Sequence, residues 1–220
     1  YLAKYDKGRY GKAVHEGNSK DGTDVHTMNQ KAAGLYLRNS AKRLLYAMMY
    51  GGGDAKLGKI VVEDALEAGH PKPKGSLKDI GARARSALMK GVLGLDKVIE
   101  GVQFKAQKRG WLKGLDGRRI ICPEKRLALN TLLQGAGAIV MKHALVVFHE
   151  RAEREFGAHG STWAYCANVH DEVQIECQPE IAEQIGQAFA DSITQAGTDL
   201  SVRCPLVGSY IVGSNWKETH

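Results

Sequence analysis

The sequence predicts an α+β protein in which helices outnumber strands. Apolar residues recur at helical spacing in several segments, above all over residues 127–156. Apolar and polar residues alternate on both sides of residues 170–172, which is typical of two half-buried strands joined by a turn. The length of 220 residues and the hydrophobic content of 43% allow a core of ordinary size.

Residues 1–24 are expected to form a connector, because they are rich in glycine and charge and contain turn signals such as Asp6-Lys7-Gly8. A helical pattern begins at Val25 and breaks near Tyr36. The next helix is predicted over residues 38–50, and the glycine triplet that follows is typical of a helix C-terminus. No strand precedes the triplet and no Gly-Lys-Ser/Thr follows it, so a phosphate-cradling loop is not expected there.

The remainder of the chain alternates helical and strand-like patterns. In order, we expect a helix, an exposed basic loop, a long helix, a short hairpin, a second long helix, a longer hairpin, a further helix and a strand-like ending. These segments are residues 55–69, 69–79, 83–109, 111–122, 127–156, 161–178, 179–196 and 202–212. In the longer hairpin, Trp163 and Tyr165 on one arm and Ile175 and Cys177 on the other recur at period two.

The turn of the longer hairpin carries three consecutive titratable residues, His170, Asp171 and Glu172. Two adjacent carboxylates resist joint ionisation unless water or a cation compensates them. One interpretation is a solvated acidic turn, which is favoured for an arbitrary acidic pair. The other is a site for a hard cation such as Mg²⁺, which takes oxygen ligands and is usually bound together with substrate phosphates. The second interpretation requires a phosphate-binding surface elsewhere in the chain.

The helix predicted over residues 38–50 offers such a surface. Arg38, Lys42, Tyr46 and Tyr50 follow one another at intervals of four, so they share one helical face. Two cations suit a triphosphate, and two phenol rings suit a sugar and a base. Taken alone, the same pattern is equally typical of a solvated basic face followed by a partly buried aromatic stripe.

Composition points to an anionic partner, with nucleic acid as the first candidate. The net charge is +7 and the pI is about 9.2. The four cysteines show no Cys-x-x-Cys spacing, which argues against a zinc site or a disulfide framework and fits a reduced, cytoplasmic protein. No apolar run approaches the ~20 residues of a membrane span, so no membrane partner is expected. The first residue is Tyr1, which suggests a piece of something longer.

Five short motifs occur in a fixed order. They are Asp24-Val25-His26; Arg38-Asn39-Ser40-Ala41-Lys42 with Tyr46 and Tyr50-Gly51; Leu115-Asp116-Gly117-Arg118-Arg119; Asn130 with Gln134; and His170-Asp171-Glu172. In this order they resemble the motifs of family A DNA polymerases, over essentially the whole chain. The second resembles motif B, on the fingers helix, and the last resembles motif C, on a palm hairpin. The ending from Asn215-Trp216 to His220 is similar to the replicative polymerases of T-odd-type phages.

The resemblance implies an α+β fold with a mostly helical fingers subdomain and part of a palm subdomain, whose antiparallel hairpin carries the catalytic carboxylates. Residues 1–24 would then connect palm to fingers, residues 25–110 would form the fingers, and residues 111–220 would form the palm. The cell is expected to be bacterial or phage-infected, with the protein in its cytoplasm.

The resemblance also implies a role for each matching residue. Asp171 would bind the catalytic magnesium ions, with Glu172 beside it as a less certain ligand or an electrostatic support. Arg38, Lys42 and His26 would hold the triphosphate of the incoming deoxynucleotide (dNTP), and Lys42 would also neutralise or protonate the departing pyrophosphate.

Other matching positions would contact the nucleotide sugar or the DNA. Tyr46 would lie by the incoming sugar and base, and its hydroxyl suggests tolerance for sugars that lack the 3′-hydroxyl. Asn130 and Gln134, four apart on a predicted helix, would donate hydrogen bonds in the minor groove, where the acceptors are shared by all base pairs. The expected primer-template contacts are Tyr50, Gly51, Asn130, Gln134, His170, Arg118 and Arg119.

One departure from the family pattern matters most. The family also needs a motif A aspartate, on a strand just upstream of the residues that match Tyr1 to Gln30. Asp6 and Asp24 sit in no such strand pattern, so neither is expected to replace it. We therefore expect the two Mg²⁺ ions to be shared with an aspartate outside this chain, and the isolated chain to be inactive.

Three hypotheses follow. The first is the fingers-and-palm part of a template-directed DNA polymerase, with primer-template DNA, dNTP and an N-terminal polymerase part, in the same chain or a separate one, as partners. The second is a non-catalytic module that binds primer-template or nucleotide. The third, less favoured, is a relative of single-subunit RNA polymerases, which a preference for ribonucleotides would promote.

Overall fold

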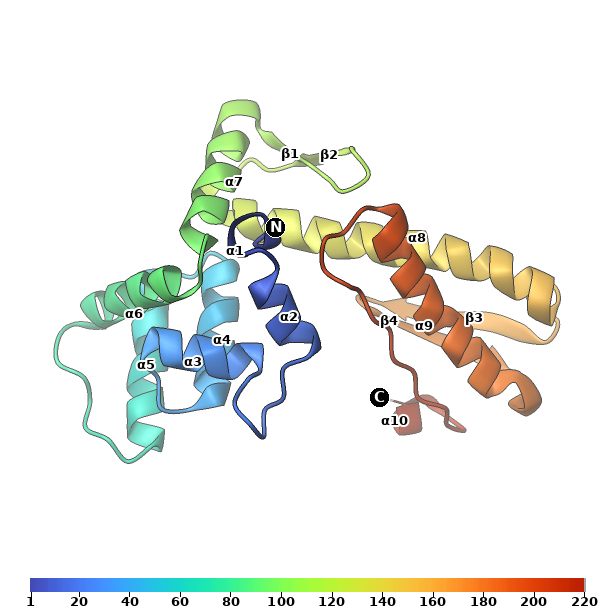
Figure 1. Ribbon diagram of the computed structural model, residues 1–220, viewed down its shortest axis with the longest axis horizontal. Helices are drawn as coiled ribbons and strands as arrows, with labels where there is room; N and C mark the ends of the chain where they lie inside the picture. The colour runs from blue at the N-terminus through green and yellow to red at the C-terminus, as the bar shows by residue number, and fades with distance from the viewer. Residues whose placement is uncertain (220) are drawn as a thin grey trace. The chain divides into compact units, whose positions relative to one another are not determined.

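The computed structural model describes residues 1–219, and these fold as a mostly helical α+β protein with two small antiparallel sheets (Figure 1). The α+β class expected from the sequence is confirmed. The chain divides into two compact units. The first unit comprises residues 1–113 and 119–133, and the second comprises residues 114–118 and everything from residue 134 onward. Each unit is described separately.

The first unit is built from helices and one short hairpin. Its elements are α1 (Ala3–Asp6), α2 (Arg9–His15), α3 (Val25–Ala33), α4 (Arg38–Met49), α5 (Asp54–Glu67), α6 (Leu77–Gly91), α7 (Leu95–Arg109), β1 (Trp111–Lys113), β2 (Arg119–Ile121) and the 3-10 turn η1 (Lys125–Leu127). β1 and β2 pair antiparallel, with Leu112 opposite Ile120. The hairpin expected over residues 111–122 is present.

Helices α5 and α6 pack against each other through two glycines. A Cβ atom on Gly58 would lie 1.8 Å from the carbonyl oxygen of Leu77, and one on Gly81 would lie 1.8 Å from that of Asp54. Only glycine fits at either position, because the two backbones approach too closely for any side chain. The helices thereby bring Leu57 and Ala84 into one core with Leu44 of α4.

Two sequence expectations for this unit need correction. The single helix expected over residues 83–109 is instead two helices, α6 and α7. Helix α6 begins earlier than expected, at the capping box of Ser76 and Asp79, and it ends at Gly91. Gly94 then adopts a left-handed φ of 82° before α7 begins. The connector expected over residues 1–24 also contains two short helices, α1 and α2.

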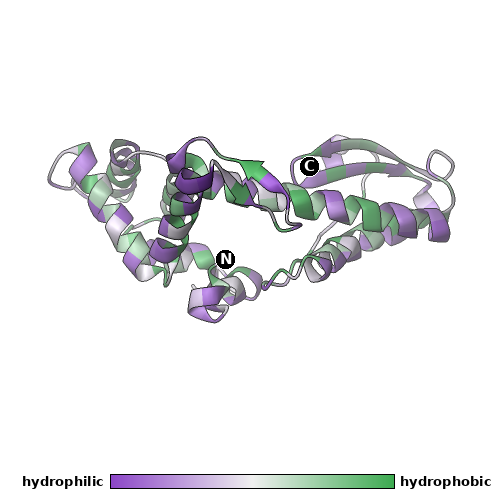
Figure 2. Ribbon diagram, turned by 90° about the horizontal axis from the view of Figure 1, so that it is seen from above, coloured by the Kyte–Doolittle hydropathy of each residue, from purple (hydrophilic) through white to green (hydrophobic). Residues whose placement is uncertain are grey.

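The second unit contains the longer hairpin and the helices that cover it. Helix α8 (Ala128–Phe156) belongs to the first unit in its first turns and to the second thereafter. The other elements are β3 (Trp163–Val169), β4 (Glu172–Cys177), the 3-10 turn η2 (Pro179–Ile181), α9 (Ala182–Asp199) and α10 (Trp216–Thr219). Green and purple residues alternate along α8 in Figure 2, so polar residues interrupt its apolar runs along the helix.

The core of the second unit is aromatic. Phe148 of α8 is fully buried and packs edge-on against Trp163 of β3 at 5.4 Å and against Phe189 of α9 at 5.2 Å between ring centroids. The indole of Trp163 donates to the carbonyl oxygen of Gly157 at 2.8 Å, which satisfies its polar atom in a buried setting. These contacts fix the root of the hairpin against α8 and α9.

The hairpin register agrees with the predicted alternation near its root. Trp163 lies opposite Cys177, and Tyr165 lies opposite Ile175. A bulge between Tyr165 and Ala167 then shifts the pairing, so the period-two pattern does not continue unchanged to the tip. The strand-like ending expected over residues 202–212 is wrong, since those residues form no strand.

Helix α8 is also long and apolar enough, by length and composition alone, to cross a membrane. An 18-residue window within residues 125–156 has a mean hydropathy of 1.5. The expectation that no segment approaches a membrane span therefore missed this helix, because polar residues interrupt its apolar runs. The core helix of a water-soluble protein passes the same test, and Ala144, Phe148 and Ala152 on this helix are fully buried.

Candidate functional site

The predicted row of cations and phenols lies on the outer face of α4. The inner face is buried in the core of the first unit by Ala41, Leu44 and Met48. Lys42 is exposed, and Arg38 is partly exposed. The rings of Tyr46 and Tyr50 stack at 6.3 Å with 21° between their planes, and both remain accessible. The spacing of four that predicted one shared face is confirmed.

A buried carboxylate from α5 anchors the chain where it enters α4. Leu37, the residue before the helix, has no side-chain hydrogen bond with which to cap it. Asp64, 1% exposed, accepts the backbone N–H of Tyr36 and of Leu37, both at 2.9 Å. A negative charge near a helix N-terminus is also favourable. The orientation of α4 is therefore set partly by a residue 27 positions along the chain.

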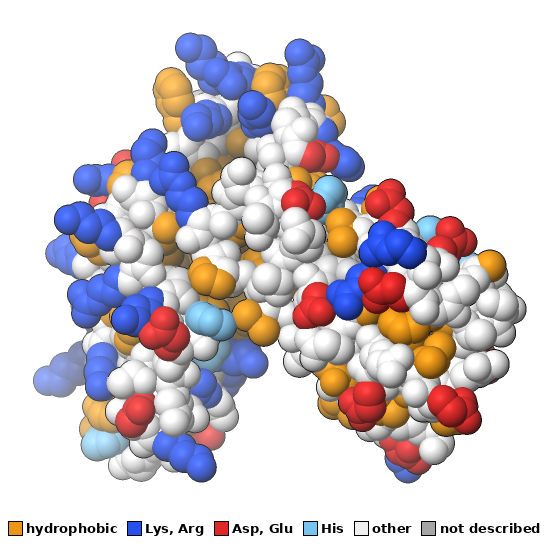
Figure 3. Space-filling view, turned by 45° about the vertical axis from the view of Figure 1, so that its right-hand side comes forward, with side chains coloured by type: hydrophobic (Ala, Val, Ile, Leu, Met, Phe, Trp, Pro, Cys, Tyr) orange, Lys and Arg blue, Asp and Glu red, His pale blue; other side chains and the backbone are white. Residues whose placement is uncertain are grey.

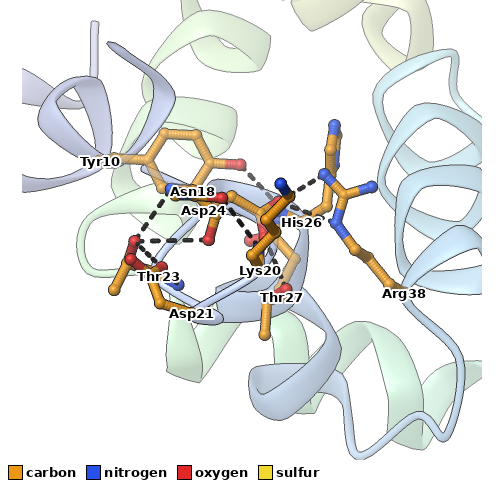
Figure 4. A network of polar contacts seen from close by, with 10 residues as sticks. Tyr10, Asn18, Lys20, Asp21, Thr23, Asp24, His26, Thr27 and Arg38 are labelled. Carbon is orange, nitrogen blue, oxygen red and sulfur yellow. Dashed lines mark hydrogen bonds and ion pairs between the residues drawn. The ribbon is translucent and has the colours of Figure 1, made fainter. Parts of the chain in front are cut away.

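At the start of α4, Arg38 pairs with Asp24 (Figure 4). Its Nε and Nη2 both donate to Asp24 Oδ1, at 3.0 and 2.6 Å. Asp24 is 6% exposed and precedes α3, whose N-terminus it caps by accepting the backbone N–H of His26 at 3.0 Å. The hydrogen bond from Arg38 holds the pKa of Asp24 far below its usual range, and the same bond raises the pKa of Arg38.

His26 lies beside this ion pair. Burial lowers the pKa of its imidazole, and the positive charges of Arg38 and Lys42 lower it further, while Asp24 opposes them. The Nδ1 atom of His26 is buried and has no hydrogen-bond partner among the described residues. His26, Arg38 and Lys42 thus form one cluster, whose positive charge comes from Arg38 and Lys42, and Asp24 is the carboxylate that acts on it.

Three predicted DNA contacts lie near the C-terminus of α4 and the start of α8. Gly51 has a φ of 74° and packs against η1, where a Cβ atom would lie 3.0 Å from the carbonyl oxygen of Arg126. Asn130 and Gln134 lie four residues apart on α8, with Gln134 exposed and Asn130 partly buried. Their predicted spacing on one helix is therefore present, but their role stays a prediction.

The two arginines of the short hairpin are held differently. Arg118 Nε donates to Asp116 Oδ2 at 2.5 Å within the turn, and its side chain is exposed. The Arg119 guanidinium lies 4.9 Å from the ring centroid of Trp111, in a cation–π contact. Both arginines are accessible to a phosphate, yet both already have a partner in the chain.

The acidic turn joins β3 to β4. His170 and Asp171 form the turn itself, and Glu172 is the first residue of β4, opposite Val169. His170 has a left-handed φ of 57°, a conformation in which histidine is enriched among non-glycine residues. Asp171 is exposed, whereas Glu172 is partly buried. The turn therefore presents one carboxylate to solvent and holds the other at the base of the tip.

Glu172 is held by neighbouring donors. Its Oε1 accepts from the side-chain amide of Gln174 and from the indole of Trp216 at 3.2 Å. Thr219 in turn donates to Gln174 Oε1 at 3.2 Å, so α10 packs on the hairpin through polar contacts. In the sequence, Trp216 belongs to the chain ending, and nothing in its spacing indicates this contact.

Asp171 and Glu172 fit part of a magnesium site. Mg²⁺ prefers carboxylate oxygens and is usually held by one or two carboxylates together with water and substrate phosphates. Among residues 1–219, no group of three or more His, Cys, Asp or Glu side chains lies close enough to hold a metal ion. The donor chemistry thus suits the ion, but the described residues supply two carboxylates at most.

Sequence reasoning missed Asp24 and Asp64 as residues that hold the site. A signal existed for each. Asp24 stands three residues before Thr27 at the start of a helical pattern, as an N-cap residue does. Asp64 falls among the apolar residues of α5 rather than on its polar face, and a carboxylate in such a position needs a partner.

Comparison with known proteins gives a consistent result. The sequence signature of DNA polymerase family A matches residues 12–218. The chain is 35% identical to the DNA-directed DNA polymerase of Enterobacteria phage T3 and 34% identical to that of Escherichia phage T7. Each alignment covers 100% of this chain and 31% of the phage protein. The DNA polymerase I of Pseudomonas aeruginosa is 28% identical over 83% of this chain and 19% of its own length.

A solved structure shares the fold. The polymerase (POL) domain of Pol1 from M. smegmatis, in complex with DNA primer-template and dNTP, superposes with a TM-score of 0.69. It covers 98% of this chain and 39% of that chain, at 19% identity, so the likeness concerns the fold alone. The chain spans about a third of the length of the phage relatives that it matches.

Proposed function

The chain belongs to DNA polymerase family A, and we propose that it is the fingers-and-palm part of a template-directed DNA polymerase. It would take part in transferring a deoxynucleotide to the 3′-hydroxyl of a primer. The observation that carries this proposal is the built face of α4, where Arg38, Lys42 and two stacked phenols follow one another on a helix anchored at its entry.

The α4 face suits an incoming dNTP. In the cluster of His26, Arg38 and Lys42, the two cations have the charge to hold a triphosphate, and His26 lies beside them. Lys42, the exposed cation, is suited to neutralise or protonate the departing pyrophosphate. Tyr46 would lie by the sugar and base, and Tyr50 would stack at the templating position. Phosphoryl transfer leaves a protein mainly positioning and charge stabilisation to do.

The DNA contacts follow from accessible donors. Asn130 and Gln134 on α8 would donate to minor-groove acceptors, which check base-pair geometry without reading sequence. Arg118 and Arg119 would contact the phosphate backbone, and Gly51 and His170 would lie near the template and the primer terminus. In this proposal residues 25–110 act as fingers, residues 111–220 act as palm, and residues 1–24 connect them.

The carboxylates of the β3–β4 turn would hold magnesium. Mg²⁺, when bound at Asp171 and Glu172, would supply charge stabilisation to the attacking and leaving oxygens. Asp171 is exposed and available as a ligand, and Glu172, fixed by Gln174 and Trp216, would add negative charge beside it. A further aspartate, of motif A, would come from a polymerase part outside this chain. The chain's coverage of about a third of its relatives supports that expectation.

Primer extension tests the proposal. This chain is incubated with Mg²⁺, primer-template and four dNTPs, first alone and then with a polypeptide carrying motif A. Extension only in the mixture, abolished by Asp171→Ala, is the expected result. Nucleotide or DNA binding without extension would favour a binding module instead, and a preference for ribonucleotides would favour an RNA polymerase relative. Extension by the chain alone would contradict the shared metal site.

A further inference from the structure

We propose that Asp24 is a positioning residue for nucleotide binding, which acts by fixing the guanidinium of Arg38. The inference rests on the proposed role of the α4 face in binding the dNTP triphosphate. Asp24 does not touch the nucleotide in this proposal. It sets the direction in which Arg38 presents its remaining donors, and it ties that direction to the start of α3, where His26 lies.

The Asp24 carboxylate is rigidly held. It is 6% exposed, and each of its oxygens has a separate task. Oδ2 accepts from the Thr27 hydroxyl at 2.6 Å, and Oδ1 accepts from the backbone N–H of His26 at 3.0 Å as well as from Arg38. Figure 4 shows the carboxylate enclosed between the first turn of α3 and the Arg38 side chain. A group fixed in this way can act as a reference point for a flexible one.

Among residues 1–219, the hydrogen-bond partner of Arg38 lies along one edge of its guanidinium. Nε and Nη2 donate to Asp24 at 3.0 and 2.6 Å, while the side chain remains 38% exposed. A guanidinium has five N–H donors in a rigid planar fork, so a partner on one edge fixes the direction of the rest. Without that partner, the long side chain would have to lose its rotamer freedom when the phosphate binds.

The charges around Arg38 favour a positioning role for Asp24 over competition between Asp24 and the nucleotide. Asp24 could instead compete with the nucleotide for Arg38, but releasing the arginine would leave a nearly buried carboxylate without its counter-ion, which is costly. The pKa of Asp24 is lowered by its bond to Arg38, so the pair stays ionised throughout the neutral range. Lys42 and Arg38 together still exceed the charge of Asp24, which leaves the cluster attractive to an anion.

Asp24→Asn separates positioning from helix capping. Asparagine caps a helix as well as aspartate does, so α3 keeps its N-terminus while Arg38 loses its counter-ion. In the complete polymerase on primer-template, the nucleotide Kd is read from single-turnover incorporation of dATP opposite thymine. We expect Asp24→Asn to raise this Kd by about tenfold, with little change in DNA affinity. Thr27→Val, which removes the bond to Oδ2 but leaves Arg38 paired, is the matched control and is expected to change the Kd by less than about twofold.

A double-mutant cycle tests whether Asp24 acts through Arg38. In an Arg38→Gln background, Asp24→Asn is expected to have no further effect on the Kd. An unchanged or lowered Kd in Asp24→Asn, or full additivity in the double variant, would overturn the proposal while leaving the role of Arg38 intact. An unchanged Kd in Arg38→Gln alone would instead remove the α4 face from nucleotide binding, and the proposal with it.

A measurement on the unsubstituted chain, with Arg38→Gln used to assign the signal, guards against misfolding of the Asp24 variants. The Nε proton of a fixed arginine exchanges slowly with water and gives a distinct NMR signal. We expect one such slowly exchanging signal to be lost in Arg38→Gln. If Arg38 Nε exchanges as fast as the exposed arginines do, the guanidinium is not held by Asp24 and the proposal fails.

Discussion

The two groups of candidate site residues differ in how the chain supports them. On α4, the cations are backed by internal partners: Asp24 pairs with Arg38, and Asp64 anchors the helix entry. At the β3–β4 turn, Asp171 projects into solvent and only Glu172 is held, by Gln174 and Trp216. The proposed phosphate-binding face is therefore largely fixed by residues of this chain, whereas the turn proposed to bind metal holds one of its two carboxylates and leaves Asp171 exposed.

The two units also differ in their balance of basic and acidic residues. Most Lys and Arg residues belong to the first unit, while Asp and Glu residues are shared equally between the two units. Figure 3 shows the resulting contrast between a surface dense in Lys and Arg and one where Asp and Glu gather. A basic unit suits triphosphate and DNA, and an acidic turn suits a divalent cation. In the proposed polymerase, the two units would therefore serve different parts of the same reaction.

The largest effect is expected from removal of the exposed carboxylate of the β3–β4 turn. In the assembled polymerase, Asp171→Ala is expected to lower single-turnover incorporation by on the order of a thousandfold or more, because a metal ligand is lost. Glu176→Gln, an exposed carboxylate on the same strand, is the control and is expected to leave the rate nearly unchanged. Incorporation by Asp171→Ala within tenfold of the wild type would rule out the turn as the metal site.

The next largest effect is on the first unit, where close helix packing supports the α4 face. Gly81→Ala is expected to destabilise folding by about 3 kcal/mol, since its Cβ atom meets the Asp54 carbonyl oxygen at 1.8 Å. Gly101→Ala on α7 meets nothing within 4 Å and is expected to stabilise by about 0.5 to 1 kcal/mol. Urea unfolding compares the two, and an equal effect from both would refute the close approach.

A smaller loss of stability is expected when the carboxylate that anchors the start of α4 is removed. Asp64→Ala leaves the backbone N–H groups of Tyr36 and Leu37 without their acceptor and is expected to cost about 1 to 2 kcal/mol. Its neighbour Glu63 pairs with Arg43 on the surface, so Glu63→Ala is expected to cost less than about 0.5 kcal/mol. Denaturant midpoints distinguish the two carboxylates, and equal costs would mean that Asp64 is not an anchor.

The smallest expected effect is a pH dependence of stability at His26. Burial lowers the pKa of folded His26 below its ordinary value of 6.5. As the pH falls below 6.5, the unfolded chain takes up a proton that the folded chain resists, so stability is lost until the pH passes below the folded pKa. Unfolding measured at pH 7.5 and pH 5.5 is expected to show a smaller acid-induced loss in His26→Gln. An identical loss in both proteins would contradict the depressed pKa.

Local patterns predicted much of the fold and of the site. The interval of four from Arg38 to Tyr50 predicted one helical face, and alternation around residues 170–172 predicted the hairpin. The helical face and the hairpin both depend on residues that are close together in the sequence. The break between α6 and α7 was missed because apolar residues continue across Val92 and Leu93, so periodicity alone gave no sign of the turn at Gly94.

The partners of the site residues could not be predicted in the same way. Asp24 lies 14 positions from Arg38, and Asp64 lies 28 positions from Tyr36. Such pairings depend on how α3, α4 and α5 pack, which no local spacing encodes. The sequence could therefore predict which residues form the candidate site, while the carboxylates that hold them could be found only in the structure.

The most direct test of the account is single-turnover dNTP incorporation by the assembled polymerase with Lys42→Ala, measured beside its affinity for primer-template. Lys42 is exposed on the face assigned to the triphosphate. We expect incorporation to slow by about a hundredfold while the Kd for DNA stays within about twofold of wild type. An unchanged incorporation rate, or a loss confined to DNA binding, would contradict the assignment of the α4 face to the nucleotide.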